Sequence, residues 1–406
     1  MKILNVCEDW RKGSGMNKQN KNMVKLVVRG QTTKLGNIVY DYGNKLLIAS
    51  LGTKASFFMF WYQSSETIVG IAFNLFAGVL ADRVNRKKIL VFTDVLACLS
   101  TFVVFLLFDE SNVWLFITVN ILLAILGTFN GPAYNAIVKE LLEKETIYQY
   151  NSYSKTISEL MNVLAPIAGI LIINVFGFKY GMLINSMSFL LSAFLEWRFE
   201  IIHELPKSDK SGNYFNSMKE GFYYISKNKS LLVVLLSSSL TNFFLAGYNF
   251  YLPFSNQFAN FDSMFAYILV AESIGSVVGA TINGISKKDL PIETYCHLLL
   301  GVGVSLFIVG FITNKWIILI LFGFTSAFLS VFNIQMMSGV QGNTHSDYLG
   351  RVFSVIFTAS LIFMPIGTLV FSLIKIRSWI VFSIIGMGNL IIYIMMCLLL
   401  RTQKQP

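Results

Sequence analysis

The sequence predicts an all-α membrane protein with twelve transmembrane helices in two pseudo-symmetric six-helix halves. Hydrophobic residues make up 54% of the chain and charged residues only 13%, against about 25% charged residues in a typical soluble domain. The apolar residues gather in runs of about 20, the length that an α-helix needs to cross the hydrocarbon core. Weak internal similarity relates the first half of the chain to the second. We therefore expect both halves to share one architecture.

Twelve long apolar runs follow one another along the chain, six before and six after a polar stretch near its centre. The predicted spans cover residues 33–52, 57–80, 89–108, 113–135, 152–176, 178–198, 231–255, 264–285, 294–313, 315–337, 353–376 and 378–400. Each can cross roughly 30 Å of hydrocarbon as an α-helix. The first is the most polar, because it carries Asp41 and Lys45.

The basic residues predict the orientation. Most of the 32 lysines and arginines fall in segments on the same side of the predicted helices as the N-terminus, and an excess of these residues marks the cytoplasmic side. We expect a multi-pass protein of the cytoplasmic (inner or plasma) membrane with both termini in the cytoplasm. Topology and contact with anionic lipid then explain the net charge of +10. The bases are too dispersed along the chain to predict a nucleic-acid partner.

Polar segments divide the chain into regions. We predict a basic cytoplasmic N-terminal extension (1–30), a first six-helix half (31–198), a central cytoplasmic loop (199–230), a second six-helix half (231–400) and a cytoplasmic tail (401–406). The extension lacks the apolar region of a signal peptide, and the true start is open between Met1, Met16 and Met23. Within the central loop, "NSMKEGFYYISKN" predicts a short amphipathic helix on the inner membrane face.

The internal similarity places chemically matching residues in corresponding helices. Superimposing the halves aligns Glu66 with Glu272, and a slightly different shift aligns Pro166 with Pro365. Parallel repeats with a substrate site between them are typical of transporters. The repeat therefore favours transport over a simple membrane anchor.

Several motifs resemble a known family. The segment "GVLADRVNRKKI" (78–89) is similar to the loop signature of the major facilitator superfamily. Asp94, "GPAYNAIVKEL" (131–141) and "LGRVFS" (349–354) resemble the branch that contains macrolide-efflux proteins and multidrug exporters. The resemblance covers roughly residues 30–400. It implies the major facilitator fold and a secondary transporter that uses a proton gradient and no cofactor.

The resemblance also implies a gate at the cytoplasmic face. The gating residues of the loop are Gly78, Asp82, Arg83, Arg86 and Lys87. Asp82 would latch this face against the start of the eleventh helix, at Gly350 and Arg351, because a carboxylate is stabilised at a helix N-terminus.

Two departures from the family pattern affect these expectations. Asn85 stands where the loop signature usually has glycine, and asparagine tolerates a left-handed backbone better than most residues. The fourth helix lacks the arginine that many proton-coupled members carry there, so the coupling mechanism is not simply inherited.

Charged residues inside predicted spans are the main functional candidates, because burying a charge there costs at least about 2.5–3.5 kcal/mol. Lys34, Asn37, Asp41 and Lys45 follow at spacings of three or four residues and share one helix face. The helical rise places Asp41, Lys45 and Glu66 in one layer, and the repeat places Glu272 at a similar depth.

Two interpretations of this layer remain open. Asp41, Glu66 and Glu272, with Lys45 beside them, are candidates for proton uptake and release or for binding a cationic substrate. Alternatively, Asp41 and Lys45 form a structural ion pair and the two glutamates support the fold through hydrogen bonds.

In the superfamily fold, the first, fourth, seventh and tenth helices surround the substrate. The resemblance therefore implies the following cavity candidates: Asn37, Asn130, Tyr134, Asn242, Tyr248, Asn333 and Gln335. Pro166 and Pro365 are predicted hinges, because proline removes a helical hydrogen bond and permits a bend.

The predicted function is export of a lipophilic or amphipathic, drug- or macrolide-like molecule by proton antiport, with alternating access in a monomer. Such efflux would confer multidrug resistance. A proton-coupled importer of a small metabolite and a transport-inactive immunity or receptor protein are the alternatives. The sequence predicts no enzyme and no metal site, because it shows no nucleophile–base pair and its histidines and cysteines are scattered.

Overall fold

The computed structural model describes residues 18–203, 214–286, 290–345 and 348–401, which form helices joined by short connections. The first half contains α2 (Lys18–Ala49), η1 (Gly52–Lys54), α3 (Ala55–Arg83), α4 (Arg86–Leu106), α5 (Val113–Leu141), α6 (Lys144–Phe176) and α7 (Phe178–Trp197). Between the halves lies α8 (Tyr214–Lys227). The second half contains α9 (Lys229–Tyr251), η2 (Leu252–Phe254), α10 (Ser255–Ala259), α11 (Met264–Ser286), α12 (Ile292–Tyr295), α13 (His297–Val309), α14 (Lys315–Gly342), α15 (Leu349–Leu373) and α16 (Ile380–Arg401). The all-α prediction is confirmed.

Each predicted span coincides with a helix or, for 294–313, with the pair α12 and α13. Among the described residues, nine helices are long and apolar enough to cross a membrane. They are α4, α5, α6, α7, α9, α11, α14, α15 and α16, and α13 is shorter. Twelve crossings therefore remain a prediction.

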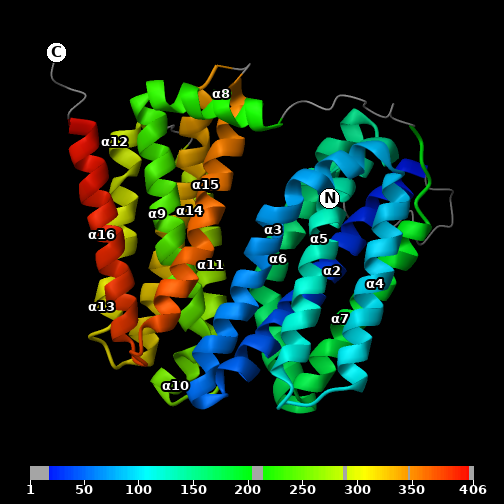
Figure 1. Cartoon of the computed structure of the whole chain (residues 1–406), viewed down its shortest axis with the longest axis horizontal. Coiled ribbons are helices and arrows are strands. Elements are labelled where there is room, and N and C mark those ends of the chain that lie inside the picture. Colours follow the sequence, from blue (N-terminus) through cyan, green and yellow to red (C-terminus); the bar gives the residue numbers. More distant parts are fainter. Residues whose placement is uncertain (1–17, 204–213, 287–289, 346–347, 402–406) are drawn as a thin grey trace.

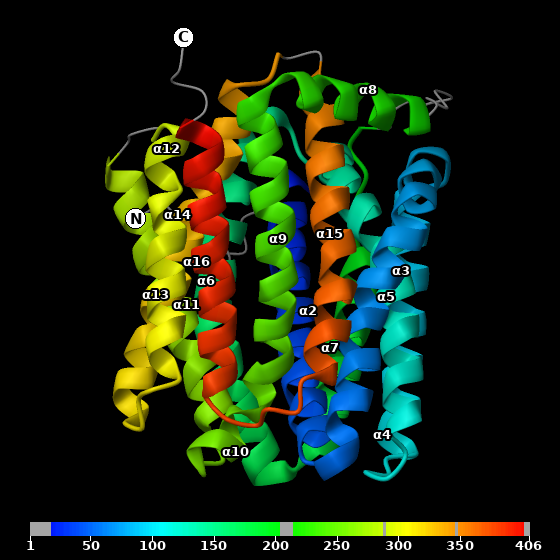
Figure 2. The ribbon, with the colours of Figure 1, turned by 60° about the vertical axis from the view of Figure 1, so that its left-hand side comes forward.

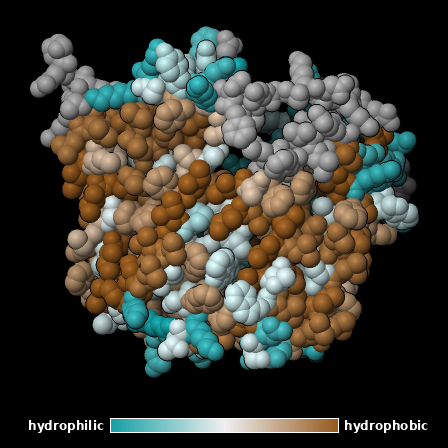
Figure 3. Space-filling model, viewed as in Figure 1, coloured by the Kyte–Doolittle hydropathy of each residue, from teal (hydrophilic) through white to brown (hydrophobic). Residues whose placement is uncertain are grey.

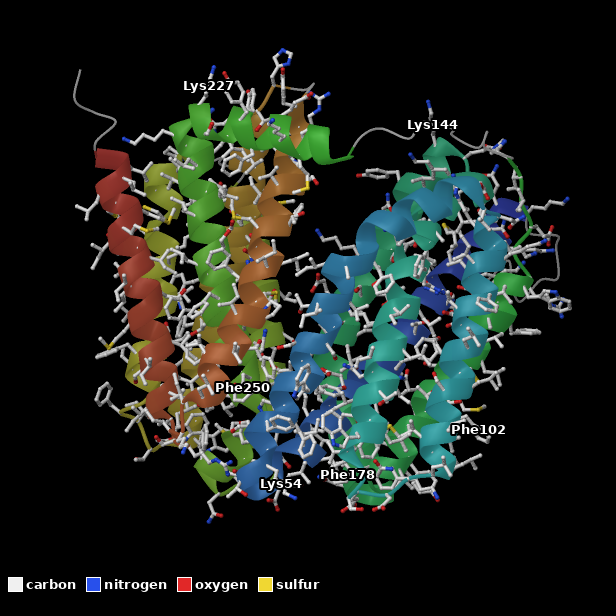
Figure 4. The ribbon with its side chains drawn as sticks, viewed as in Figure 1. Lys54, Phe102, Lys144, Phe178, Lys227 and Phe250 are labelled. Carbon is white, nitrogen blue, oxygen red and sulfur yellow. The ribbon has the colours of Figure 1, made fainter. Side chains whose placement is uncertain are left out.

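The helices form two bundles side by side (Figures 1 and 2). The short helix α8 lies across one end of the molecule, and α10 lies at the other end. We call these the α8 end and the α10 end. Figure 4 places Lys144 and Lys227 at the α8 end, and Lys54, Phe178 and Phe250 at the α10 end. The helix at α8 confirms the helical segment predicted within the central loop.

The apolar cores show how the two halves meet. At the α10 end, one core combines Tyr42, Met59 and Tyr62 of the first half with Phe250 and Phe265 of the second. At the α8 end there are separate cores, one confined to the first half and one to the second. The halves are therefore packed together at the α10 end and have independent cores at the α8 end.

The outer surface is apolar over the middle of the molecule and hydrophilic at both ends (Figure 3). Helix α4 illustrates this surface, because Phe92 and Leu99 are 64% and 54% exposed. Large exposed apolar patches mark a membrane or protein contact. The apolar residues around the middle of the molecule are distributed as contact with lipid requires. Between the halves, more polar residues, drawn paler in Figure 3, interrupt this apolar surface.

The first helix begins at Lys18, well before the predicted start at residue 33. The helix thus extends beyond the predicted span, and three of its polar residues before position 33, Gln19, Asn22 and Arg29, are buried. Asn22 donates from Nδ2 to the carbonyl oxygens of Leu141 (3.2 Å) and Glu200 (2.7 Å). Buried polar groups are tolerated when they are hydrogen-bonded. Part of the predicted N-terminal extension thus belongs to the first bundle.

Asn85 does not have the left-handed backbone expected at a glycine position. Its φ is −61° and its ψ is 113°, and its side-chain Oδ1 accepts a hydrogen bond from the Lys88 backbone N–H at 3.2 Å. Asparagine is a favoured N-cap because its oxygen satisfies a free N–H of the first helical turn. Asn85 therefore begins α4.

Helices α11 and α14 pack backbone to backbone at two glycines. A Cβ atom on Gly275 would lie 2.0 Å from the carbonyl oxygen of Gly323, and one on Gly279 would lie 2.4 Å from that of Ala327. Small residues permit such approach between membrane helices. The two glycines, four residues apart on α11, therefore allow the close packing of α11 against α14.

Replacing Gly275 with valine should therefore destabilise the second half, because the backbone of α14 cannot yield to the new side chain. We expect a loss of about 1–3 kcal/mol, measured as a lower thermal unfolding midpoint of the purified full-length protein. Gly284→Val is the matched control on the same helix, since a Cβ there meets no atom within 4 Å. Equal midpoints for the two variants would contradict the close packing.

Candidate functional site

A cavity of about 360 Å³ lies between the two halves. We call it the interface cavity. The first half contributes Ile38, Asp41, Tyr42, Lys45, Glu159, Asn162 and Pro166, and the second contributes Asn249, Leu252, Phe265, Leu269, Glu272, Ser273, Ser276 and Ser326. The wall thus combines apolar and aromatic surface with a small number of charged groups, as ligand sites commonly do.

Three further cavities share wall residues with it, and one of these, of about 480 Å³ in the first half, shares Glu159. The N-half cavity, about 650 Å³, lies among helices of the first half, and Asp41 and Ile38 belong to its wall as well as to that of the interface cavity. A smaller cavity of about 110 Å³ lies within the second half and shares Glu272 with the interface cavity. Asp41 and Glu272 therefore occupy comparable positions, each where the interface cavity meets a cavity of its own half.

Asp41 forms an ion pair with Lys45, whose Nζ donates to Oδ2 at 2.6 Å. The Tyr62 hydroxyl donates to Asp41 Oδ1 at 3.3 Å, and Asn44 Nδ2 donates to that hydroxyl at 3.2 Å. The i,i+4 spacing in α2 produced this pair, as the sequence suggested. Glu66 lies across from α2 in the wall of the N-half cavity, where it is exposed.

The interface cavity holds more acid than base. Glu272 accepts a hydrogen bond from the hydroxyl of Tyr248. Glu159 Oε2 accepts a hydrogen bond from Asn162 Nδ2 at 3.1 Å. With Asp41, these make three carboxyl groups in one wall against Lys45, which also lies within electrostatic reach of Glu66 and Glu272. The wall can therefore bind protons or a cation.

The predicted cavity residues do not line one common cavity. Asn37 lines the N-half cavity. Asn242 donates to the Ser238 carbonyl of its own helix, and Gln335 bonds Asn283 and the Leu290 backbone. Asn333 is exposed and lines none of the cavities described above. Tyr248 lines the small cavity of the second half as the partner of Glu272.

The gating candidates have partners within their own halves. Arg86 pairs with Glu140 at the end of α5, and Lys87 Nζ donates to the Phe199 carbonyl at 2.9 Å. Arg351 pairs with Glu220 of α8 at 2.7 Å, and Gly350 is exposed. Gly78, Asp82 and Arg83 belong to the last part of α3, but their burial and side-chain contacts lie outside what the structure describes. The latch between Asp82 and the start of α15 stays a prediction.

Both hinge candidates lie inside helices, Pro166 in α6 and Pro365 in α15. Pro166 also lines the interface cavity. A bend at this proline would therefore change the cavity wall directly.

A buried ionic cluster escaped the sequence prediction. Arg29 binds Glu196 and Asp94, and Asn130 and Tyr134, two predicted cavity residues, contact the same guanidinium. Arg29 lies before the predicted first span and Glu196 at the very end of the sixth, so neither counted as a charge inside the membrane. Asp94, a carboxylate inside the predicted third helix, was the signal that a basic partner existed.

The α10 end of the interface is sealed by contacts between the halves. The rings of Tyr42 and Phe265 stack with centroids 5.2 Å apart and planes inclined by 15°. Gln63 Nε2 donates to the Asn249 carbonyl at 3.0 Å, and Gln257 Nε2 donates to the Ala49 carbonyl at 2.6 Å. Arg377 Nη2 donates to the Gly52 carbonyl at 2.6 Å. Together these contacts close the cavity towards the α10 end.

Two helical halves with a cavity at their interface are an arrangement typical of membrane transporters. The chain belongs to the Major Facilitator Superfamily, whose family model matches residues 45–368. Members of this family generally need no cofactor, and the described residues contain no group of three or more His, Cys, Asp or Glu side chains that could hold a metal ion.

Relatives and solved structures agree with this assignment. Macrolide efflux protein A of Enterococcus faecalis is 25% identical over 71% of this chain and 92% of its own length. Its namesake from Streptococcus pyogenes is 26% identical over 78% and 80%. The nucleoside transporter NupG has the same fold with a TM-score of 0.70 at 11% identity, covering 95% of this chain and all of that one. A bacterial homologue of the iron transporter ferroportin, in an inward-facing state, gives a TM-score of 0.69 at 16% identity, covering 94% and 98%.

Removing the Phe265 ring should weaken the seal at the α10 end. A stacked aromatic pair contributes about 1 kcal/mol, and its loss should raise the population that opens at this end roughly fivefold. The opening can be measured with Ser276→Cys, which places a thiol in the interface cavity of a protein without its native cysteines. An impermeant maleimide is added at the α10 side, and the rate at which it alkylates this cysteine reports how often the α10 end opens.

Phe261→Ala is the matched control for this measurement. Phe261 packs against the edge of the same apolar core, but its ring stacks on Tyr267 of its own half, with centroids 5.7 Å apart, and not on a ring of the first half. This variant should leave the alkylation rate unchanged. The same rate for both variants would show that the Tyr42–Phe265 stack does not hold the seal.

Proposed function

We propose that the protein exports a lipophilic or amphipathic small molecule across the cytoplasmic membrane by proton antiport, with alternating access to the interface cavity. The observation that carries this proposal is the position of Asp41. Asp41 lines both the interface cavity and the N-half cavity and is paired with Lys45. A charged pair at such a junction is a functional candidate in a membrane bundle, because its burial is costly.

In this proposal the α8 end faces the cytoplasm. The positive-inside rule assigns the central loop and both termini to that side. The seal at the α10 end would then close the cavity to the outside, while the separate cores at the α8 end leave the halves free to part on the inside. A substrate would enter from the cytoplasm or the inner leaflet and leave when the seal opens.

Protonation is proposed to act through Lys45. When Asp41 takes up a proton, it loses the charge that holds Lys45, and the ammonium can then be attracted by Glu66 or Glu272. The same exchange of partners would follow if a cationic substrate displaced Lys45. Proton and substrate would therefore compete for one set of carboxylates, which is the requirement for antiport.

The walls of the interface cavity favour an amphipathic substrate. Apolar and aromatic side chains such as Tyr42, Leu252 and Phe265 face the same space as the carboxyl groups. Its volume of about 360 Å³ lies within the range of roughly 300–1,000 Å³ that is usual for small-molecule sites. Relatives named as macrolide efflux proteins support export as the direction of transport.

Cells that express the protein should accumulate less of a transported dye or macrolide than control cells, and a protonophore should remove the difference. Fluorescence or radiolabel accumulation across a panel of amphipathic compounds measures this. Higher accumulation in expressing cells would indicate the importer instead. Unchanged accumulation over the whole panel would count against any transport of this class of compound.

Asp41→Asn and Glu66→Gln should lower proton-driven efflux at least about tenfold, because each removes one ionisable group from the layer around Lys45. The measurement is efflux from proteoliposomes with an imposed pH gradient. Glu110→Gln, in the exposed loop before α5, is the control and should behave as the wild type. Near-normal efflux by both cavity variants would refute their coupling role.

A further inference from the structure

The Arg29 cluster joins three helices of the first half. Arg29, on α2, donates from Nε to Glu196 Oε1 of α7 at 2.7 Å and from Nη2 to Asp94 Oδ2 of α4 at 3.0 Å. The three side chains are 6%, 0% and 4% exposed in that order. One guanidinium therefore holds two carboxyl groups through adjacent donors, and little of each side chain is exposed.

The neighbouring helices add neutral groups to this cluster. From α5, Asn130 accepts from Arg29 Nη2 at 2.8 Å and the Tyr134 ring lies 4.4 Å from the guanidinium carbon. From α6, the Tyr150 hydroxyl bonds that of Tyr134 at 3.0 Å. These groups satisfy hydrogen bonds but carry no charge that could balance the second carboxylate.

Lys25, one turn before Arg29 on α2, does not pair with either carboxyl group of the cluster. Lys25 Nζ donates to the Arg198 carbonyl at 2.5 Å and lies 3.9 Å from Glu200. With both Asp94 and Glu196 ionised, the cluster would hold one negative charge in excess. An uncompensated charge at this degree of burial is strongly unfavourable.

One carboxyl oxygen of the cluster lacks a donor. Glu196 Oε2 is buried and has no hydrogen-bond partner among the described residues. The corresponding oxygen of Asp94, Oδ1, accepts from Asn130 Nδ2 at 2.9 Å. A single proton on the two acids would remove the excess charge and would turn the unpartnered oxygen into a hydroxyl or provide it with a donor.

We propose that Asp94 and Glu196 together bind one exchangeable proton beside Arg29, and that this proton is released and rebound during transport. The release and rebinding of this proton during transport rest on the proposed antiport function. Arg29 and Asp94 line the N-half cavity, whose wall also contains Asp41 and Glu66. The proton therefore passes between a carboxyl oxygen of the cluster and water in that cavity, and no other bond is made or broken.

Infrared spectroscopy of the purified full-length protein in lipid tests the proton site without any transport. The wild type should show a protonated-carboxyl C=O band that disappears as the pH is raised and shifts in D₂O. Glu196→Gln should lack this contribution, because the remaining Asp94 is balanced by Arg29. Asp94→Asn should also lack the band, because the remaining Glu196 is balanced by Arg29. This variant replaces Glu196→Gln in the test if Glu196→Gln does not fold.

Glu140→Gln is the control for the spectra. Glu140 is also buried but forms an ion pair with Arg86, and its loss should leave the band unchanged. A band of wild-type intensity in Glu196→Gln and Asp94→Asn would overturn the proton site.

Transport by the same variants tests the role of the proton. Glu196→Gln should retain energy-independent exchange of substrate across the membrane but lose accumulation driven by a pH gradient. Wild-type pH-driven transport in a variant without the band would show that the proton is static, and would overturn its role in the cycle. If the wild type exports no compound at all, the proposed function fails, whereas the spectra still decide the proton site.

Discussion

Charged side chains inside the bundle must be neutralised locally, and the rest of the structure depends on this constraint. Hydrocarbon cannot solvate an ion, so each charge needs a counter-charge, a proton or contact with a water-filled cavity. Arg86 and Glu140 meet the requirement as a simple pair. Asp41 and Lys45 meet it as a pair that borders two cavities. Arg29 holds two carboxyl groups beside the N-half cavity, and in the proposal above one proton on the two acids balances their charge.

The same constraint explains why the halves can separate at one end. Their shared core at the α10 end is apolar and aromatic, with hydrogen bonds from side chains such as Gln63 and Gln257 to backbone carbonyls of the other half. None of the ion pairs among the described residues joins one half to the other. Opening the interface therefore breaks none of these ion pairs, and it parts apolar surface and a few hydrogen bonds.

Much of the fold could be predicted from the sequence, because membrane helices are marked by the length of their apolar runs and by short-range spacing. The Asp41–Lys45 pair and the close approach at Gly275 follow from spacing within one helix. The Arg29–Glu196 pair joins residues 167 positions apart, and no local pattern encodes such a partner. The burial of polar residues at the start of α2 could not be predicted either, because it also depends on partners that are distant in the sequence. Asn22 becomes buried only when α5 and the segment after α7 pack against it. Predicted cavity residues such as Asn130 proved to be partners of that hidden cluster.

Helix α2 connects the cluster and the seal. Arg29 lies in its first part, and Tyr42, whose ring closes the interface against Phe265, lies beside Asp41 further along the same helix. At a rise of 1.5 Å per residue, Arg29 and Asp41 are roughly 18 Å apart on one helical axis. A continuous helix transmits a tilt at one end to the other without any chain of rearranged side chains. In the proposed cycle, a change in the charge of the Arg29 cluster would alter how α2 is held against α4 and α7, and a shift of α2 would reach the Tyr42 ring at the α10 end. Proton occupancy and access to the cavity can thus be linked through a single element.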